Sequence, residues 1–197
     1  MALSFFINGF QATEYSAEQL FSRYCDSGNT AYLEKLIVMH GDALYHYLLR
    51  QSDRSLAEDI SQQCWLKLLQ LPYSFRGNSS FKTWLFSVGR NCLIDELRRQ
   101  KRWQAELEPE LLDLAVANTA TNCPATQFDQ MQRQLKWAGQ LALLPFLQRE
   151  ALMLQLEGFS LSQISAITGQ GEETIKSRLR YARQALQQLS GEPYEQA

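Results

Sequence analysis

The sequence predicts an all-α protein made of two small helical domains joined by a flexible acidic linker. Apolar residues recur at helical spacing through most of the 197 residues, whereas the alternation typical of strands is nearly absent. The apolar fraction of 45% is large enough to form hydrophobic cores. One internal stretch, 105–128, loses the helical periodicity and contains two prolines. These three observations predict the fold class.

The aperiodic stretch also sets the predicted domain organisation, because few contacts are expected to cross such a segment. We expect an N-terminal tail at 1–15, a first domain at 16–104, the linker at 105–128, a second domain at 129–190 and a C-terminal tail at 191–197.

Charge is segregated along the chain although the net charge is only −2. Residues 76–103 hold seven basic and two acidic residues, residues 104–129 hold no basic and five acidic residues, and residues 172–189 hold four basic and two acidic residues. Nucleic-acid binding depends on where cations lie more than on their total. Two local basic stretches are therefore compatible with DNA binding.

The first domain contains two strongly periodic helices. In SLAEDISQQCWLKLLQLP, Asp53 or Ser55 is available as an N-cap and Pro72 follows the end. In SSFKTWLFSVGRNCLIDELRRQKRW the apolar set continues to Leu97. Between them YSFRGNSS reads as a turn-forming loop. The inward side chains are predicted to be Leu56, Ile60, Cys64 and Leu68 on the first helix, with Trp65 and Leu69 beside them, and Phe81, Trp84, Leu85, Val88, Cys92 and Leu93 on the second.

The second domain has the signature of a helix-turn-helix, predicted over 160–183. A helix that starts at Pro145 ends at Gly158, and Ser160 with Gln163 forms a capping-box pattern for the next short helix. Glycines at 169 and 171 then turn the chain into a third helix. In this motif the second helix enters the major groove.

That last helix has an apolar stripe at Ile175, Leu179, Ala182, Leu186 and Leu189. A solvated amphipathic helix is the simpler interpretation, but the preceding capped helix and turn favour DNA recognition. Arg178 and Arg183 on the flanks would hold phosphates, and Lys176, Arg180 and Gln184 would reach base edges. The predicted DNA-binding face comprises Glu173, Thr174, Lys176, Ser177, Arg178, Arg180, Tyr181, Arg183 and Gln184.

Two glutamates open this basic helix. Glu172 lies four residues before Lys176, so we expect it to pair with that lysine and to stabilise the helix N-terminus. Glu173 is predicted to face the groove beside Arg180. A carboxylate there can accept from a cytosine amino group and repels phosphate, which would sharpen sequence choice.

The cations of the first domain are interleaved with aromatic and small polar side chains, a mixture typical of sites for flipped or unpaired bases. Core packing is the simpler interpretation of Phe81, Trp84 and Leu85, and a solvated helix end is that of Arg98, Arg99, Lys101 and Arg102. Both interpretations stay open at this point.

Other classes of site are disfavoured. The four cysteines have no C-x-x-C spacing, so we expect packing roles and neither a metal site nor a redox pair. His40 and His46 point in different directions on a helix and would not share a metal. No cofactor is indicated. The chain shows no membrane-spanning run and no secretory signal at its start, which predicts a cytoplasmic protein without membrane insertion.

Taken together, AEDISQQCWLKLLQ, SFRGNSSFKTWLFSVGRNCLIDELRRQKR, LPFLQREALMLQLEGFSLSQISAITG and TIKSRLRYARQAL resemble regions 2 and 4 of bacterial RNA polymerase sigma factors of the extracytoplasmic-function group. The resemblance covers about three quarters of the chain in the right order. It implies a promoter-specificity subunit without catalysis of its own, whose partners are core RNA polymerase, promoter DNA as duplex and as unwound non-template strand, and an anti-sigma protein.

The resemblance also implies residue roles. The helix of the first stretch would dock on the clamp coiled coil of the polymerase through Asp59, Gln62, Gln63, Trp65 and Lys67. The helix-turn-helix would read the minus-thirty-five element. The minus-ten element would be bound by Phe75, Arg76, Gly77, Asn78, Ser79, Lys82, Arg90, Asn91, Arg98, Arg99 and Arg102.

The chain departs from the family pattern at several places. Gln63 stands where a glutamate is usual, and Tyr181 where an arginine is common. Gly171, Glu172 and Glu173 replace the usual residues before the recognition-helix threonine. The DNA sequence that is read is therefore not inherited from the resemblance.

Two other functional classes compete with this interpretation. A stand-alone helix-turn-helix regulator would not need the basic, aromatic YSFRGNSSFKTW stretch. An enzyme that used Glu58 and Asp59 as an acid pair is disfavoured, because adjacent helical residues diverge by about 100°.

Overall fold

The structure, a computed structural model, describes residues 15–70, 75–107 and 137–190, and it is helical throughout these ranges apart from short turns. The predicted linker beyond residue 107 and both predicted tails lie outside the described residues, apart from Tyr15. None of the described helices is long and apolar enough to cross a membrane.

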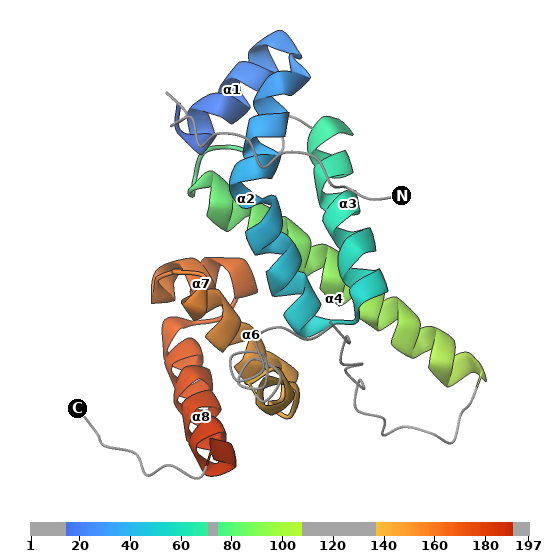
Figure 1. The fold of residues 1–197 in the computed structure, drawn as a ribbon, viewed down its shortest axis with the longest axis vertical. Helices are drawn as coiled ribbons and strands as arrows, with labels where there is room; N and C mark the ends of the chain where they lie inside the picture. Colours follow the sequence, from blue (N-terminus) through green and yellow to red (C-terminus); the bar gives the residue numbers. More distant parts are fainter. Residues whose placement is uncertain (1–14, 71–74, 108–136, 191–197) are drawn as a thin grey trace, which may run out of the picture.

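The N-terminal group consists of α1 (Ala17–Ser27), α2 (Thr30–Gln51), α3 (Arg54–Gln70) and α4 (Phe81–Leu107). Asp53 accepts the Leu56 N–H at 2.9 Å, so it is the N-cap predicted for α3. Helix α4 crosses behind α2 and α3, and its last turns project away from the other helices (Figure 1). It extends to Leu107, slightly past the predicted domain boundary.

The inward faces predicted for α3 and α4 form the core of this group. Leu68 and Phe81 are fully buried, and so are Leu85 and Leu93. Helices α2 and α4 approach closely at Gly89, where an added Cβ would lie 2.8 Å from Leu44 Cδ1. Trp84 and Val88 are only partly buried, and Leu69 is 42% exposed.

The C-terminal group consists of a short helical stretch at 137–142, α6 (Phe146–Leu156), α7 (Leu161–Thr168) and α8 (Glu172–Ser190). The predicted capping box is present, since Ser160 Oγ accepts the Gln163 N–H and Gln163 Oε1 accepts the Ser160 N–H. Gly169 ends α7 with φ of 66°, a conformation that favours glycine. The helix-turn-helix of the sequence prediction is thus formed by α7 and α8.

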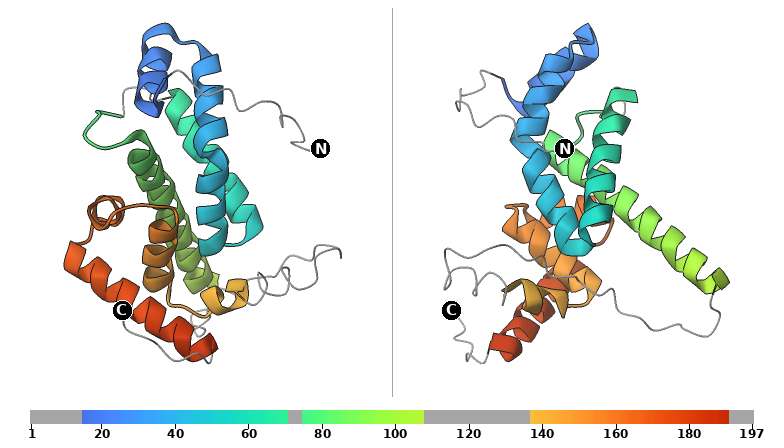
Figure 2. Two further views of the ribbon diagram at one scale, coloured as in Figure 1. Left: turned by 60° about the vertical axis from the view of Figure 1, so that its left-hand side comes forward. Right: turned by 45° about the vertical axis from the view of Figure 1, so that its right-hand side comes forward.

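The two groups pack against each other. Helix α6 lies at the foot of α2, α7 contacts α4, and α8 lies on the outer side (Figure 2). Phe86 of α4 meets Phe159 edge-on with ring centroids 4.8 Å apart. Apolar and ionic side chains therefore join the two groups directly, a contact that the sequence analysis did not predict.

Candidate nucleic-acid and polymerase interfaces

Helix α8 presents one face to the core and the other to solvent. Ile175, Leu179 and Ala182 are buried as predicted, whereas Leu189 is 42% exposed near the helix end. On the outer face, Ser177 and Arg178 are half-buried. The remaining predicted DNA contacts are exposed, namely Glu173, Thr174, Lys176, Arg180, Tyr181, Arg183 and Gln184. The helix therefore offers a polar, largely cationic surface at the outside of the molecule.

The pairing of the two glutamates differs from the prediction. Lys176 Nζ donates to Glu173 Oε1 at 2.7 Å, three residues away, and no hydrogen bond joins Lys176 to Glu172 among the described residues. This hydrogen bond, with the carboxylate charge, raises the pKa of Lys176. Lys176 thus donates its hydrogen bond to Glu173 and not to Glu172, the predicted partner, although the charge of Glu172 also raises the pKa of Lys176.

The arginines of α8 are not equivalent. Arg183 donates to Gln155 Oε1 of α6 at 2.7 Å, and Arg178 donates to Gln170 Oε1 of the turn at 3.4 Å. Among the residues that the structure describes, Arg180 interacts with its neighbour alone, donating to Tyr181 Oη at 3.3 Å with the guanidinium 5.0 Å from the ring centroid. Arg180 is therefore the arginine of α8 that is least tied to the scaffold.

The loop before α4 provides an exposed part of the predicted minus-ten surface. Arg76, Gly77, Asn78 and Ser79 are all exposed, and Gly77 has φ of 71°. Phe75 differs from them, because its ring packs against Phe21, Phe81 and Trp84 with centroids 5.3–5.9 Å apart. The simpler interpretation of these aromatics as packing residues thus holds for Phe81, and Phe75 anchors the loop in the same cluster.

Two predicted minus-ten cations lie in the contact between the helical groups. Lys82 Nζ donates to the main-chain oxygen of Glu157 at 2.7 Å and lies 4.8 Å from the Phe159 ring centroid. Arg90 binds Glu150 with Nε and Nη2 at 2.8 and 3.2 Å. Both side chains are half-buried, whereas the neighbouring Asn91 is exposed.

The end of α4 carries exposed arginines that pair locally. Arg99 makes two 2.8 Å hydrogen bonds to Glu96, which lower the pKa of that carboxyl. Arg98 lies 3.9 Å from Asp95. Arg102 is on the same helix, but its side chain lies outside the described residues.

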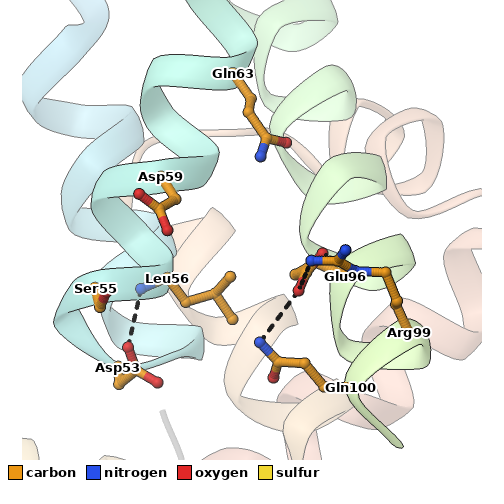
Figure 3. Close-up of a pocket in the computed structure, with 8 residues that line it drawn as sticks. All are labelled: Asp53, Ser55, Leu56, Asp59, Gln63, Glu96, Arg99 and Gln100. Carbon is orange, nitrogen blue, oxygen red and sulfur yellow. Dashed lines mark hydrogen bonds and ion pairs between the residues drawn. The ribbon is translucent and has the colours of Figure 1, made fainter. Parts of the chain in front are cut away.

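The predicted polymerase-binding residues lie along the outer face of α3. Asp59, Gln62, Gln63 and Lys67 are exposed, and Trp65 is half-buried. Asp59 and Gln63 line a shallow polar groove of about 170 Å³ between α3 and α4, with Arg99 and Gln100 on the opposite side (Figure 3). Leu66, 52% exposed, stands beside them and was not predicted. An outward leucine between two inward positions is the sequence signal that could have identified it.

The sequence analysis also missed a buried polar cluster between the two groups. Glu150 of α6 is fully buried, binds Arg90 and accepts from Tyr47 Oη at 3.3 Å. Beside it, the Arg149 side chain donates to Gln51 Oε1 at 3.2 Å. Burial and the Glu150 charge raise the pKa of Tyr47. The sequence signal for this cluster is the pair of charged residues inside the apolar run FLQREALMLQL. Charges that are buried need partners, so these residues indicate a polar contact with another element.

Two of the cysteines are buried, as their expected packing role requires, and neither forms a disulfide. Cys64 of α3 and Cys92 of α4 are both buried, and their sulfur atoms interact. Lys67 Nζ donates to Cys92 Sγ at 3.1 Å. Residues 28 positions apart meet because α3 and α4 cross at this point, which their spacing does not reveal.

Comparison with known proteins agrees with this architecture. The sigma-70 region 2 family model matches residues 36–103, and the sigma-70 region 4 model matches residues 136–186. The chain is 30% identical over 159 residues to the ECF RNA polymerase sigma factor SigM of Bacillus subtilis, covering 80% of this chain and 94% of that protein. It is 34% identical over 134 residues to EcfG of Rhodopseudomonas palustris, covering 68% of this chain and 70% of the relative.

Solved structures show the same fold. The sigma factor RpoE of Bartonella quintana, in complex with the anti-sigma factor NepR, superimposes with a TM-score of 0.66 at 26% identity, covering 84% of this chain and all of that one. CnrH, in complex with the cytosolic domain of CnrY, gives a TM-score of 0.63 at 21% identity and supports the fold, with 89% and 97% of the two chains covered. The chain therefore belongs to the sigma-70 family, in its extracytoplasmic-function (ECF) group, as a non-enzymatic promoter-specificity subunit of RNA polymerase.

Proposed function

We propose that this sigma factor binds promoters through two surfaces and binds core polymerase through a third. Helix α8 reads the minus-thirty-five element, the loop at 75–80 with the exposed side of α4 binds the minus-ten element, and α3 docks on the clamp coiled coil. The observation that carries the proposal is the outer face of α8, where exposed cations follow a capped helix and a glycine turn.

On α8, Arg180 and Gln184 act as base readers and Arg183 as a phosphate contact. Arg180 has no partner from another of the described helices, so its guanidinium is available for a bidentate contact to guanine. Arg183 is held against α6 by Gln155, and a positioned guanidinium at the helix flank suits a phosphate. Glu173 acts as a selectivity residue.

In the minus-ten region, Asn78 and Ser79 line the pocket for a flipped base, with Arg76 beside it as a cation for the strand. Packing of Phe75 into the aromatic cluster supports this proposal, because it fixes one end of the loop on the core. Flipping a base costs a few kcal/mol, so binding must be supported by contacts to polymerase.

On α3, Asp59, Gln62, Gln63 and Lys67 form the polymerase-binding face, with Leu66 at its centre. A single apolar side chain surrounded by polar ones is a common arrangement at protein interfaces. Trp65 supports this face from its inner side.

The contact between the helical groups implies a closed form of the free protein. Arg90 and Lys82 bind Glu150 and the Glu157 carbonyl, so both must leave these partners before they bind DNA. We propose that core polymerase separates the groups and that an anti-sigma protein in the cytoplasm holds them together. The structure of RpoE in complex with NepR supports an anti-sigma partner, since that relative is bound by one.

Run-off transcription with purified core polymerase on a genomic promoter pool tests the proposal. New start sites should appear when the protein is added, and the Arg180→Ala variant should lose a subset of them. If no new start sites appear while the protein still protects DNA in the absence of polymerase, a stand-alone helix-turn-helix regulator is the better description.

A further inference from the structure

Two thiols and a lysine meet between α3 and α4. Cys64 is fully buried and Cys92 is 5% exposed, and neither takes part in a disulfide. Lys67 Nζ donates to Cys92 Sγ at 3.1 Å, and the sulfurs of Cys92 and Cys64 are hydrogen-bonded. A lysine that extends from an exposed position to a buried sulfur is an unusual partner for a packing cysteine, because free cysteines normally behave as apolar side chains.

The charges around the pair distinguish the two sulfurs. The hydrogen bond from Cys64 and then that from Lys67 lower the pKa of Cys92, against the opposing effects of burial and of Asp95. The same hydrogen bond and complete burial raise the pKa of Cys64. Cys92, whose sulfur accepts from the Lys67 ammonium, is therefore the thiol that loses its proton more readily. A nucleophilic sulfur beside a protonated one is the arrangement of a reactive and a resolving thiol.

Access to this pair runs past Lys67. The lysine side chain is exposed on α3 and lies over Cys92, while Cys64 lies deeper against Gly89 of α4, where an added Cβ would be 3.6 Å from its sulfur. Movement of one flexible side chain therefore exposes Cys92 first. The outer sulfur is the one that meets a small reagent from solvent.

We propose that Cys92 and Cys64 are a hydroperoxide-reactive thiol pair, activated by Lys67 and placed beneath the polymerase-binding face of α3. In the first step the Cys92 thiolate attacks the terminal oxygen of the hydroperoxide, an S–O bond forms, the O–O bond breaks and the alkoxide leaves, which is hydroxide when the reagent is hydrogen peroxide. In the second step the Cys64 sulfur attacks the sulfenic acid, an S–S bond forms, and the S–O bond breaks. The thiol proton leaves with the hydroxyl as water. Two thiols lose two electrons in total and one hydroperoxide gains them.

Oxidation changes the charge of the α3 face. When Cys92 is a disulfide, Lys67 loses its anionic hydrogen-bond partner and its ammonium is released to solvent. This part rests on the proposed polymerase contact of Lys67. Oxidised protein is expected to bind core polymerase several-fold differently from reduced protein, and thiol reductant should reverse the change.

The chemical part is tested on the reduced full chain by treatment with hydrogen peroxide, blocking of remaining thiols and non-reducing peptide mapping. We expect a peptide pair joined through Cys64 and Cys92, formed before Cys25 or Cys123 is modified. In Cys64→Ser the reaction should stop at a Cys92 sulfenic acid that dimedone traps. A folded protein in which Cys92 stays unmodified, or is no faster than Cys25, would overturn the proposal.

Two substitutions of Lys67 test whether this lysine activates Cys92. Lys67→Gln should slow alkylation of Cys92 by iodoacetamide at pH 7 by about fivefold or more, because less thiolate is present. Lys67→Arg should retain most of the rate, and Lys101→Gln, an exposed lysine on α4, should leave it unchanged. Equal rates in Lys67→Gln and the unsubstituted protein would show that Lys67 does not activate Cys92.

The functional part is measured separately, by binding of core polymerase to the reduced and the disulfide form. Equal affinities of the two forms for core polymerase would show that oxidation of the thiol pair does not affect polymerase binding, but would leave the proposed disulfide formation intact. A reduced form that does not bind core polymerase would contradict the proposed function instead, so the two failures are distinguishable.

Discussion

Arg180 is the side chain on which sequence reading by α8 depends most directly. Arg180→Ala in the polymerase complex should cost roughly 1–3 kcal/mol at one base pair of the minus-thirty-five element, because a bidentate contact to a base edge is lost. Binding to a set of single-base promoter variants measures this loss. Arg183→Ala is the matched control, since Arg183 is held by Gln155, and its loss should be uniform across the set. A uniform loss for Arg180→Ala as well would make Arg180 a phosphate contact.

Glu173 affects both selectivity and the charge available for phosphate. Its carboxylate accepts from Lys176 at 2.7 Å, so Glu173→Ala removes an anion and also frees a cation. We expect tighter nonspecific DNA binding with a steeper salt dependence, and relaxed choice at one promoter position. Salt titrations on specific and random duplexes measure both effects. Glu172→Ala, which frees no such partner, should change them less. Unchanged specificity in Glu173→Ala would reduce Glu173 to a helix-capping residue.

At the scale of elements, Glu18 of α1 caps the N-terminus of α4, a helix that begins more than sixty residues later. Glu18 Oε1 accepts the Phe81 N–H at 2.9 Å, and this hydrogen bond lowers the pKa of Glu18 from its usual 4.5. Glu18→Ala should destabilise the fold by about 1 kcal/mol, the usual cost of losing a helix cap.

The pH dependence of this contribution follows from the sign of the pKa shift. A carboxyl whose pKa is lower in the folded state stabilises the fold fully above its ordinary pKa and loses that effect as the pH falls through the folded value. The stability difference between the unsubstituted protein and Glu18→Ala should therefore shrink below about pH 4.5. Urea unfolding at pH 7 and pH 3.5 measures it, and Glu34→Ala on the exposed side of α2 is the control. A difference that stays constant with pH would contradict the charged cap.

The sequence predicted the features that depend on residues close together in the chain. The Ser160 capping box, the Asp53 cap and the apolar stripe of α8 each depend on residues within a few turns, so their spacing reveals them. The Glu18 cap, the meeting of Cys64 with Cys92 and the burial of Glu150 depend on how helices cross. No spacing within one helix contains that information, which is why the prediction missed the contact between the groups.

At the scale of the whole molecule, Glu150 links the two helical groups. Removing one partner of a buried ion pair is strongly destabilising, because the other charge is left without compensation. Arg90 can regain water if the groups separate, so we expect Glu150→Ala to populate an open form. Small-angle scattering should show a larger radius of gyration, and the free protein should bind minus-ten single strands more tightly because Arg90 is released.

Glu157→Ala is the control for this opening, because Lys82 binds the main-chain oxygen of Glu157 and not its carboxylate. It should leave the radius of gyration unchanged. If Glu150→Ala also scatters like the unsubstituted protein while remaining folded, the ion pair does not hold the groups together.

The use of a main-chain oxygen at Glu157 has a consequence for coupling between the two DNA elements. That carbonyl belongs to the turn between α6 and α7, where Gly158 has φ of 86° and Ser160 starts the helix-turn-helix. No side-chain replacement deletes this acceptor, so Lys82 loses it only when the turn changes its path or when the two groups separate. In the closed form, a rearrangement of that turn would therefore release a minus-ten lysine through one peptide group, so the two DNA-binding surfaces stay coupled until core polymerase separates the groups.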